Sequence, residues 1–298
     1  MFRKKLALLL LTVSPAIFAQ DSTQTVDKPA KEFVKKTFEN GVVINNQTVE
    51  GPAKKGLDFM IQHRFGQIKN GKDLFGIFGA ANIRLGLEYG FTKRFSLGIG
   101  AAKNNQLYDL ELKYAILKQA TGGMPVTLTY YGNMVIRAGD NATFINQENK
   151  YTAANRCYFF NELMVARKFN SHFSMQLGAS MTHLNFVADS VRKHDFIGIH
   201  ALASYRLSVM SSIQVEYNMN LSPDMVPTSI TDPTKVAFQK PNLSIGYEVS
   251  TGQHQFQIFV GNADGITGPE VISGNTYDFT KKNNLLIGFN ITRQFDFE

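Results

Sequence analysis

The sequence predicts an all-β fold, a transmembrane up-and-down antiparallel β-barrel of about 12 strands. Two observations predict it. From Gly56 to the C-terminus, apolar and polar side chains alternate in segments of about ten residues, and the connections between segments are alternately short and long. A period of two over ten residues suits a strand with one face in lipid and the other in water. Bacterial outer-membrane barrels have short periplasmic turns and longer outer loops, so the sorted connections predict the same class and the cell outer membrane.

Residues 1–20 are predicted to be a secretory signal peptide. Basic residues at positions 3–5 precede an apolar run over 6–19, which is shorter than the about 20 residues that a transmembrane helix needs. A retained N-terminal anchor is the alternative. The exact cleavage bond is left open, because Ile17 is larger than the small residue expected before a cleavage site.

Residues 21–55 form a separate N-terminal periplasmic segment in this prediction. Positions 21–28 are polar, and 29–40 allow either an amphipathic helical stretch or an irregular lid. Positions 42–49 resemble a short strand, a turn and a second strand. We expect the segment to lie at or in the periplasmic mouth of the barrel, where it can also bind a periplasmic protein.

The barrel itself is predicted over residues 56–298. Its strands are expected, in order, at 57–65, 82–89, 95–101, 108–116, 126–138, 158–168, 173–182, 197–206, 213–219, 242–249, 255–260 and 285–297. The sixth is the weakest, because Asn161 shares a face with Leu163 and Val165. Ten or fourteen strands are the alternative counts, since strand boundaries read from one sequence shift by about two to four residues.

Composition limits the other functions and fold classes that the chain could have. The formal net charge of +7 becomes +4 once the three basic residues of the signal peptide are removed, and no basic cluster remains, so nucleic-acid binding is not expected. The single cysteine, Cys157, allows no intrachain disulfide. No motif for a cofactor or a metal is present, so none is predicted. A large soluble β-sandwich is compatible with composition alone but gives no reason for connections sorted by length.

The polar face of the predicted strands carries charges of both signs. These lumen-facing candidates are Arg64, Arg84, Glu88, Glu111, Lys113, Arg137, Arg206, Glu216 and Glu248, with Asp58, Asp109 and Glu162 on the same face. In a hydrated pore such charges select ions. Because both signs are mixed, we favour opposite charges that pair across neighbouring strands and fill the lumen.

Three stretches resemble a known family. Residues 42–49, then Gly56-Leu57-Asp58-Phe59-Met60-Ile61-Gln62-His63-Arg64-Phe65-Gly66 and Asn82-Ile83-Arg84-Leu85-Gly86-Leu87-Glu88-Tyr89-Gly90, are similar to an uncharacterised family of Bacteroidota outer-membrane β-barrels. The resemblance covers the mature chain, and Gln-His-Arg-Phe-Gly is its most specific part. It implies the fold and the membrane but no activity. His63 has the parity of a lipid-facing residue near the outer rim, so we expect a structural rim role for it.

An enzyme is the main alternative to a barrel that passes or binds a small solute. A lipid hydrolase needs a serine, a histidine that takes its proton and a third residue that orients the histidine. The nearest pairing, His172 with Ser174, lacks the signature of outer-membrane phospholipases. We therefore predict no enzymatic activity, a small-solute channel or binding barrel in contact with outer-membrane lipid, and, as a further alternative, a structural barrel that anchors a periplasmic partner.

Overall fold

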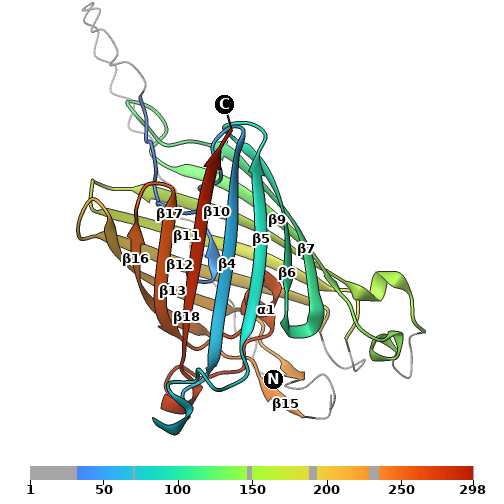
Figure 1. The fold of residues 1–298 in the computed structure, drawn as a ribbon. Helices are drawn as coiled ribbons and strands as arrows, with labels where there is room; N and C mark the ends of the chain where they lie inside the picture. Colours follow the sequence, from blue (N-terminus) through green and yellow to red (C-terminus); the bar gives the residue numbers. More distant parts are fainter. Residues whose placement is uncertain (1–31, 70, 146–149, 188–192, 228–234, 298) are drawn as a thin grey trace, which may run out of the picture. The chain divides into compact units, whose positions relative to one another are not determined.

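The computed structural model describes residues 32–69, 71–145, 150–187, 193–227 and 235–297, and its main element is a closed antiparallel β-barrel (Figure 1). The predicted signal peptide and residues 21–31 lie outside the described residues. Strands follow one another around the barrel in chain order, and β18 closes it against β4. The all-β fold class is confirmed, and so is the count of 12 strands.

The barrel strands occupy the predicted positions with small differences at their ends. They are β4 Gly56–Gln67, β5 Asn82–Gly90, β6 Phe95–Ala102, β7 Leu107–Leu117, β9 Thr127–Arg137, β10 Cys157–Lys168, β11 Phe173–Leu184, β12 Asp195–Arg206, β13 Ser211–Asn220, β16 Asn242–Ser250, β17 His254–Gly261 and β18 Leu286–Asp296.

Side chains alternate strictly between the two faces of the wall. In β5, Arg84 and Glu88 are 2% and 3% exposed, whereas Leu85 between them is 47% exposed. An apolar outer face and a polar inner face are what a strand between lipid and water requires. In β10, Asn161 lies on the outer face, where its amide oxygen accepts a hydrogen bond of 2.5 Å from the Tyr130 hydroxyl. This contact explains why the sixth predicted strand tolerates a polar residue on its apolar face.

Apart from the long turn 118–126 and the short loop 103–106, connection lengths sort by end, as predicted. The turns at one end are 91–94, 118–126, 169–172, 207–210 and 251–253, and the loops at the other end are 68–81, 103–106, 138–156, 185–194, 221–241 and 262–285. By the rule for bacterial barrels we call the first the periplasmic end and the second the outer end. Strand β1 (Glu32–Phe33) pairs with β8 (Ala120–Thr121) inside a periplasmic turn, so the described chain begins at that end.

The outer loops carry the remaining short elements. These are η1 Gly71–Asp73, η2 Asn104–Gln106, η3 Asn141–Phe144, η4 Ala153–Arg156, β14 Met225–Pro227, β15 Val236–Phe238, α1 Gly268–Ser273 and η5 Lys282–Asn284. Among the described residues, no helix has the length and apolarity needed to cross a membrane.

Residues 37–50 lie inside the barrel, and we call them the lumen segment. Strands β2 (Val42–Val43) and β3 (Asn46–Gln47) pair as a hairpin within it, which confirms the strand, turn and strand predicted at 42–49. Of the two alternatives for 29–40, the described part, 32–40, is irregular apart from β1. Val43, Ile44 and Val49 form one buried apolar cluster with wall residues such as Met164 and Leu202.

Candidate functional site

The tip of the lumen segment is held by two buried charged residues of the wall. Arg64 donates through Nε to the side-chain oxygen of Asn45 (3.0 Å) and through Nη2 to the carbonyl of Ile44 (3.0 Å). Glu216 accepts from the Asn45 main-chain N–H (3.0 Å) and side-chain amide (2.5 Å). Both charged side chains are fully buried, so each depends on these bonds to offset the loss of hydration.

The backbone at the tip is strained. Ile44 has a φ of +53° and is fully buried, and a β-branched residue rarely adopts this left-handed conformation. Such a residue costs about 1–3 kcal/mol and persists only where its surroundings fix it. Here the fixing contacts are the bonds to Arg64 and Asn290, whose side chains both donate to the Ile44 carbonyl.

Both arms of the lumen segment are bound through their main chain by glutamines of the wall. Gln257 accepts from the N–H of Ile44 (3.2 Å) and donates to the carbonyl of Val42 (2.9 Å). Gln176 accepts from the N–H of Val49 (2.9 Å) and donates to the carbonyl of Gln47 (2.8 Å). A hairpin without a neighbouring strand has unpaired edges, and these amides satisfy them.

Lys113 fixes the periplasmic base of the lumen segment. Its ammonium donates to the carbonyls of Glu50 (2.6 Å) and Gly41 (3.3 Å), which lie on the two arms. The same ammonium lies 3.8 Å from Glu88. A further bond joins the Asn40 amide to the Thr292 hydroxyl at 2.8 Å.

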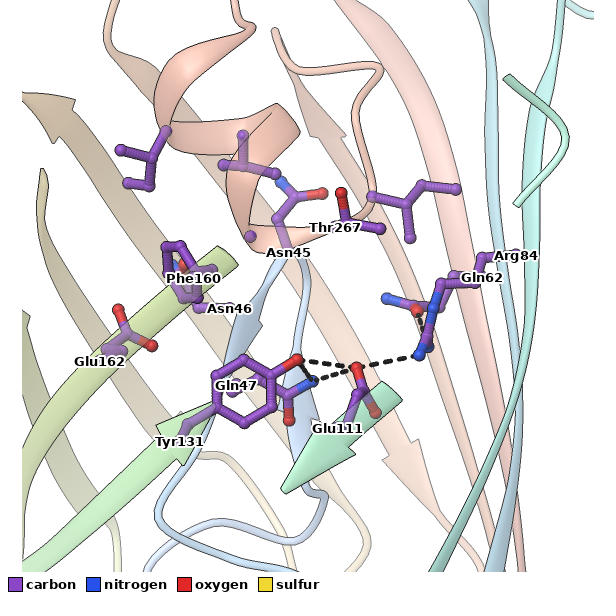
Figure 2. A pocket seen from close by; sticks show the side chains of 14 residues that line it. Asn45, Asn46, Gln47, Gln62, Arg84, Glu111, Tyr131, Phe160, Glu162 and Thr267 are labelled. Carbon is purple, nitrogen blue, oxygen red and sulfur yellow. Dashed lines mark hydrogen bonds and ion pairs between the residues drawn. The ribbon is translucent and has the colours of Figure 1, made fainter. Parts of the chain in front are cut away.

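Other predicted lumen charges pair across the wall. Arg84 contacts Asp109 at 2.5 Å and Glu111 at 2.9 Å, and Glu111 accepts from the Tyr131 hydroxyl at 2.8 Å. Figure 2 shows Arg84, Glu111 and Tyr131 beside Gln47 of the lumen segment. A cavity of about 20 Å³ lies between them, which is room for about one water molecule. The lumen segment and the wall side chains thus occupy most of the space around this cavity.

The remaining candidates occupy three different settings. Glu248 is buried and accepts from Gln257 at 2.7 Å. Arg206, near the periplasmic end, forms an ion pair with Glu39. Arg137, at the outer end, lies 5.4 Å from the ring centroid of Phe144. The partners of the charged candidates thus lie on the lumen segment, on other strands of the wall and, for Arg137, on an outer loop.

His63 lies on the outer face of β4, beyond the lumen. Its ring stacks on Phe289 of β18 with centroids 5.0 Å apart and an interplanar angle of 3°. Phe65 packs against the same pair at 4.5 Å from the His63 centroid. The ring is thus part of an aromatic group at the seam where the barrel closes.

Helix α1 covers the lumen from the outer end. Ile272 belongs to the same buried cluster as Val43 and Ile44. A Cβ on Gly198 of the wall would lie 2.6 Å from the Ile272 side chain, so the missing side chain lets the helix touch the wall. Thr267 and Glu270 form a capping box at the helix start, which satisfies N–H groups that would otherwise be unpaired inside the barrel.

The loop that carries α1 contains two partly buried carboxyl groups, those of Asp264 and Glu270. Burial raises the pKa of Glu270 above its ordinary value of 4.5, against the opposing effect of the Ile266 and Thr267 N–H groups. Burial likewise raises the pKa of Asp264 above 3.8, although a hydrogen bond from Tyr277 opposes it. Docking of this loop therefore favours the protonated carboxyl groups.

Neither His200 nor His172 has the neighbours of a hydrolase triad. Nδ1 of His200 contacts Glu162 at 2.7 Å, but its Nε2 faces the Gln176 amide at 2.9 Å. A triad requires a serine at that nitrogen. His172, the histidine nearest to Ser174 in the sequence, contacts Ser171 at 3.0 Å in an exposed turn. In the described part of the chain, no three His, Cys, Asp or Glu residues are placed to hold a metal ion.

Sequence reasoning missed the neutral residues that bind the lumen segment. Gln176, Gln257, Asn290 and Thr292 have inward parity, which was the available signal. Their partners, however, lie more than 120 residues away in the chain, and no local pattern encodes such pairs.

Comparison with solved structures finds porins and channels. The NanC porin matches with a TM-score of 0.48 and 10% identity, over 81% of this chain and 100% of that chain. The KdgM porin matches with 0.43 and 9%, over 82% and 99%. The COG4313 outer membrane channel from Pseudomonas putida F1 matches with 0.46 and 10%, over 83% and 97%. No curated protein matches the chain.

A family model described as "Membrane bound beta barrel domain (DUF5777)" matches residues 38–295, which include nearly all of the lumen segment and the whole barrel wall. A closed barrel with an apolar outer face and connections sorted by length is the architecture of the bacterial outer membrane. The chain is an outer-membrane β-barrel, and it belongs to this family of membrane-bound β-barrel domains.

Proposed function

We propose that the protein is a small-solute channel whose lumen is closed by its own N-terminal segment. The observation that carries the proposal is the way in which the wall binds the lumen segment. Wall side chains contact its main chain through amide and charged groups, such as Gln176, Gln257 and Arg64. Water can satisfy the same wall groups when the segment leaves, so the wall suits both a closed and a hydrated state.

A segment that only filled the lumen would not need these polar contacts between the wall side chains and its main chain. Well-packed apolar residues are often as stabilising as buried charges or more so. The strained φ of +53° at Ile44 also makes the closed state costly. Both features favour a segment that is released over one that only fills space.

Opening requires the segment to move toward the periplasm, because both of its ends lie there. The predicted periplasmic partner of residues 21–55 fits this step. Glu32 and Phe33 are exposed at the periplasmic end, so a protein that binds this part of the chain can shift the equilibrium between closed and open states. The identity of such a partner stays a prediction.

The channel is tested by conductance in planar bilayers. We compare the wild type with the double variant Gln176→Leu/Gln257→Leu, which removes amide partners from both arms. Each buried main-chain group left unpaired costs the closed state about 1–3 kcal/mol, so we expect rare openings in the wild type and frequent ones in the variant.

The matched control is Gln255→Leu on the same strand as Gln257. Gln255 is fully buried on the inner wall but donates to the turn carbonyl of Gly252. We expect its conductance to equal that of the wild type. Barrels that insert without conducting in every variant would overturn the proposal.

A further inference from the structure

The outer loop between β4 and β5 exposes a compact apolar surface. Leu74, Phe75, Ile77 and Phe78 are 45%, 59%, 46% and 76% exposed. Exposed apolar groups of this kind, gathered in one short loop, mark a binding surface more often than isolated residues do. We call these residues the apolar loop.

The conformation of the apolar loop is fixed by its own contacts. The Gly66 N–H at the end of β4 donates to the Gly76 carbonyl at 3.0 Å. A Cβ on Gly76, which has a φ of +87°, would lie 2.0 Å from the Gly66 oxygen, so only glycine fits there. Asp73 accepts from the main-chain N–H groups of Lys69 (2.6 Å) and Gly76 (3.2 Å).

The loop also holds unfavourable backbone conformations. Leu74 and Phe75 have φ angles of +49° and +57°, a left-handed conformation that is unfavourable for bulky residues. The strain places apolar side chains outward instead of burying them. Backbone strain in a loop that leaves its apolar side chains exposed indicates that those side chains have a function.

The apolar loop continues the lipid-facing surface of the barrel. It follows the outward residues His63 and Phe65, which stack with Phe289 at the barrel seam. The main-chain N–H of Ile68 donates to the Leu285 carbonyl at 2.8 Å, and this bond joins the loop to the end of η5. Figure 1 shows the two short helical turns, one teal and one red, together beyond the ends of β4 and β18.

Basic residues surround the apolar loop on both connected segments. The exposed lysines are Lys69, Lys72, Lys281 and Lys282. Asp73 accepts hydrogen bonds from main-chain N–H groups of the loop, and Asp278, which accepts from Thr280, also interacts electrostatically with Lys281. Apolar side chains beside ammonium groups match a lipid that carries both acyl chains and phosphates.

We propose that this surface binds a phosphorylated acyl lipid of the outer leaflet. The apolar loop contacts acyl chains at the membrane edge, and the lysines contact the phosphates above them. The occupant is a lipid because the surface continues the wall that already faces lipid and carries the opposite charge to phosphate. This site is independent of the closure of the lumen.

The first experiment uses the absence of tryptophan from the chain. Phe78→Trp places a single indole on the apolar loop, and the protein is reconstituted into vesicles of brominated phosphatidylcholine. We expect blue-shifted emission and strong quenching by the bromine atoms. Emission at the wavelength of a water-exposed indole, with no quenching, would overturn the proposal.

The second experiment tests the phosphates. Lipid A is titrated into neutral detergent micelles that hold the Phe78→Trp protein, and the indole emission is followed. Replacing Lys69, Lys72, Lys281 and Lys282 with Gln should weaken binding about fivefold for each lysine. The matched control replaces Lys35, Lys54, Lys55 and Lys93 with Gln at the periplasmic end and should leave binding unchanged. Equal binding in both variants, or no response to lipid A, would overturn the assignment of a phosphorylated lipid.

Discussion

Asn45 is the residue on which closure of the lumen depends most directly. Arg64 donates to its side-chain oxygen, and Glu216 accepts from its amide groups. Glu216 also accepts from Asn46 (3.1 Å) and Asn242 (2.8 Å). Glu216 thus joins the lumen segment to two strands of the wall, although no basic side chain contacts it directly among the described ion pairs.

Removing the Glu216 carboxylate should release the tip of the lumen segment. Glu216→Ala leaves the buried amide groups of Asn45, Asn46 and Asn242 without their acceptor, and each unpaired group costs about 1–3 kcal/mol. Glu216→Gln keeps an acceptor and should cost about 1 kcal/mol. The measurement is the rate at which a thiol reagent modifies Val43→Cys, a fully buried position, in a Cys157→Ser background. Equal rates in the Ala and Gln variants would contradict this role.

Residue by residue, the sequence was sufficient to place side chains on the correct face but not to pair them. Arg84 on β5 meets Asp109 and Glu111 on β7, across the intervening strand β6 and not on an adjacent strand as the mixed charges suggested. Arg64 and Lys113 instead bind carbonyl groups of the lumen segment. A carbonyl carries no mark in the sequence, so these contacts could not be predicted.

At the scale of elements, local sequence patterns predicted the strands and the hairpin but not the contacts between elements that lie far apart in the chain. The alternation predicted each barrel strand, and the hairpin at 42–49 follows from a short apolar pair on each side of a turn. Its docking depends on glutamines far away in the chain. Helix α1 was not predicted, although Thr267 and Glu270 have the spacing of a capping box. It is only six residues long, too short for apolar periodicity to reveal it.

Docking of the α1 loop should weaken as the pH rises. The docked loop raises the pKa values of Glu270 and Asp264, so it binds protons more tightly than the released loop. Its stability is therefore greatest below the ordinary values of 4.5 and 3.8 and is lost as the pH rises through the raised values. Hydrogen exchange over 266–274, corrected for the intrinsic rate, should show faster opening at higher pH.

Two amide variants, one a test and one a control, show whether Glu270 is the group that titrates. Glu270→Gln removes the titrating group and should flatten the dependence on pH. Asp278→Asn alters an exposed carboxyl whose pKa is lowered by hydrogen bonds from Thr280, and it should leave the dependence unchanged. The same pH slope in Glu270→Gln as in the wild type would show that Glu270 is not responsible.

At the scale of the whole molecule, the barrel and its lumen segment form one closed unit. The wall pairs every strand with two neighbours, so it leaves no sheet edge in the membrane. The segment is attached covalently to β4 at Gly56 and enters from the same end, which allows it to leave without disturbing the wall. Closure and membrane insertion are therefore separable properties of the chain.

A crosslink between Asn40 and Thr292 tests the central claim most directly. Their side-chain atoms lie 2.8 Å apart, so cysteines at both positions, in a Cys157→Ser background, can be joined by a short bifunctional thiol reagent. The measurement is single-channel conductance before and after the reaction, with each single cysteine as a control. We predict that openings stop when the segment is joined to the wall and persist in the controls. Openings that continue unchanged in the crosslinked barrel would contradict closure by the lumen segment.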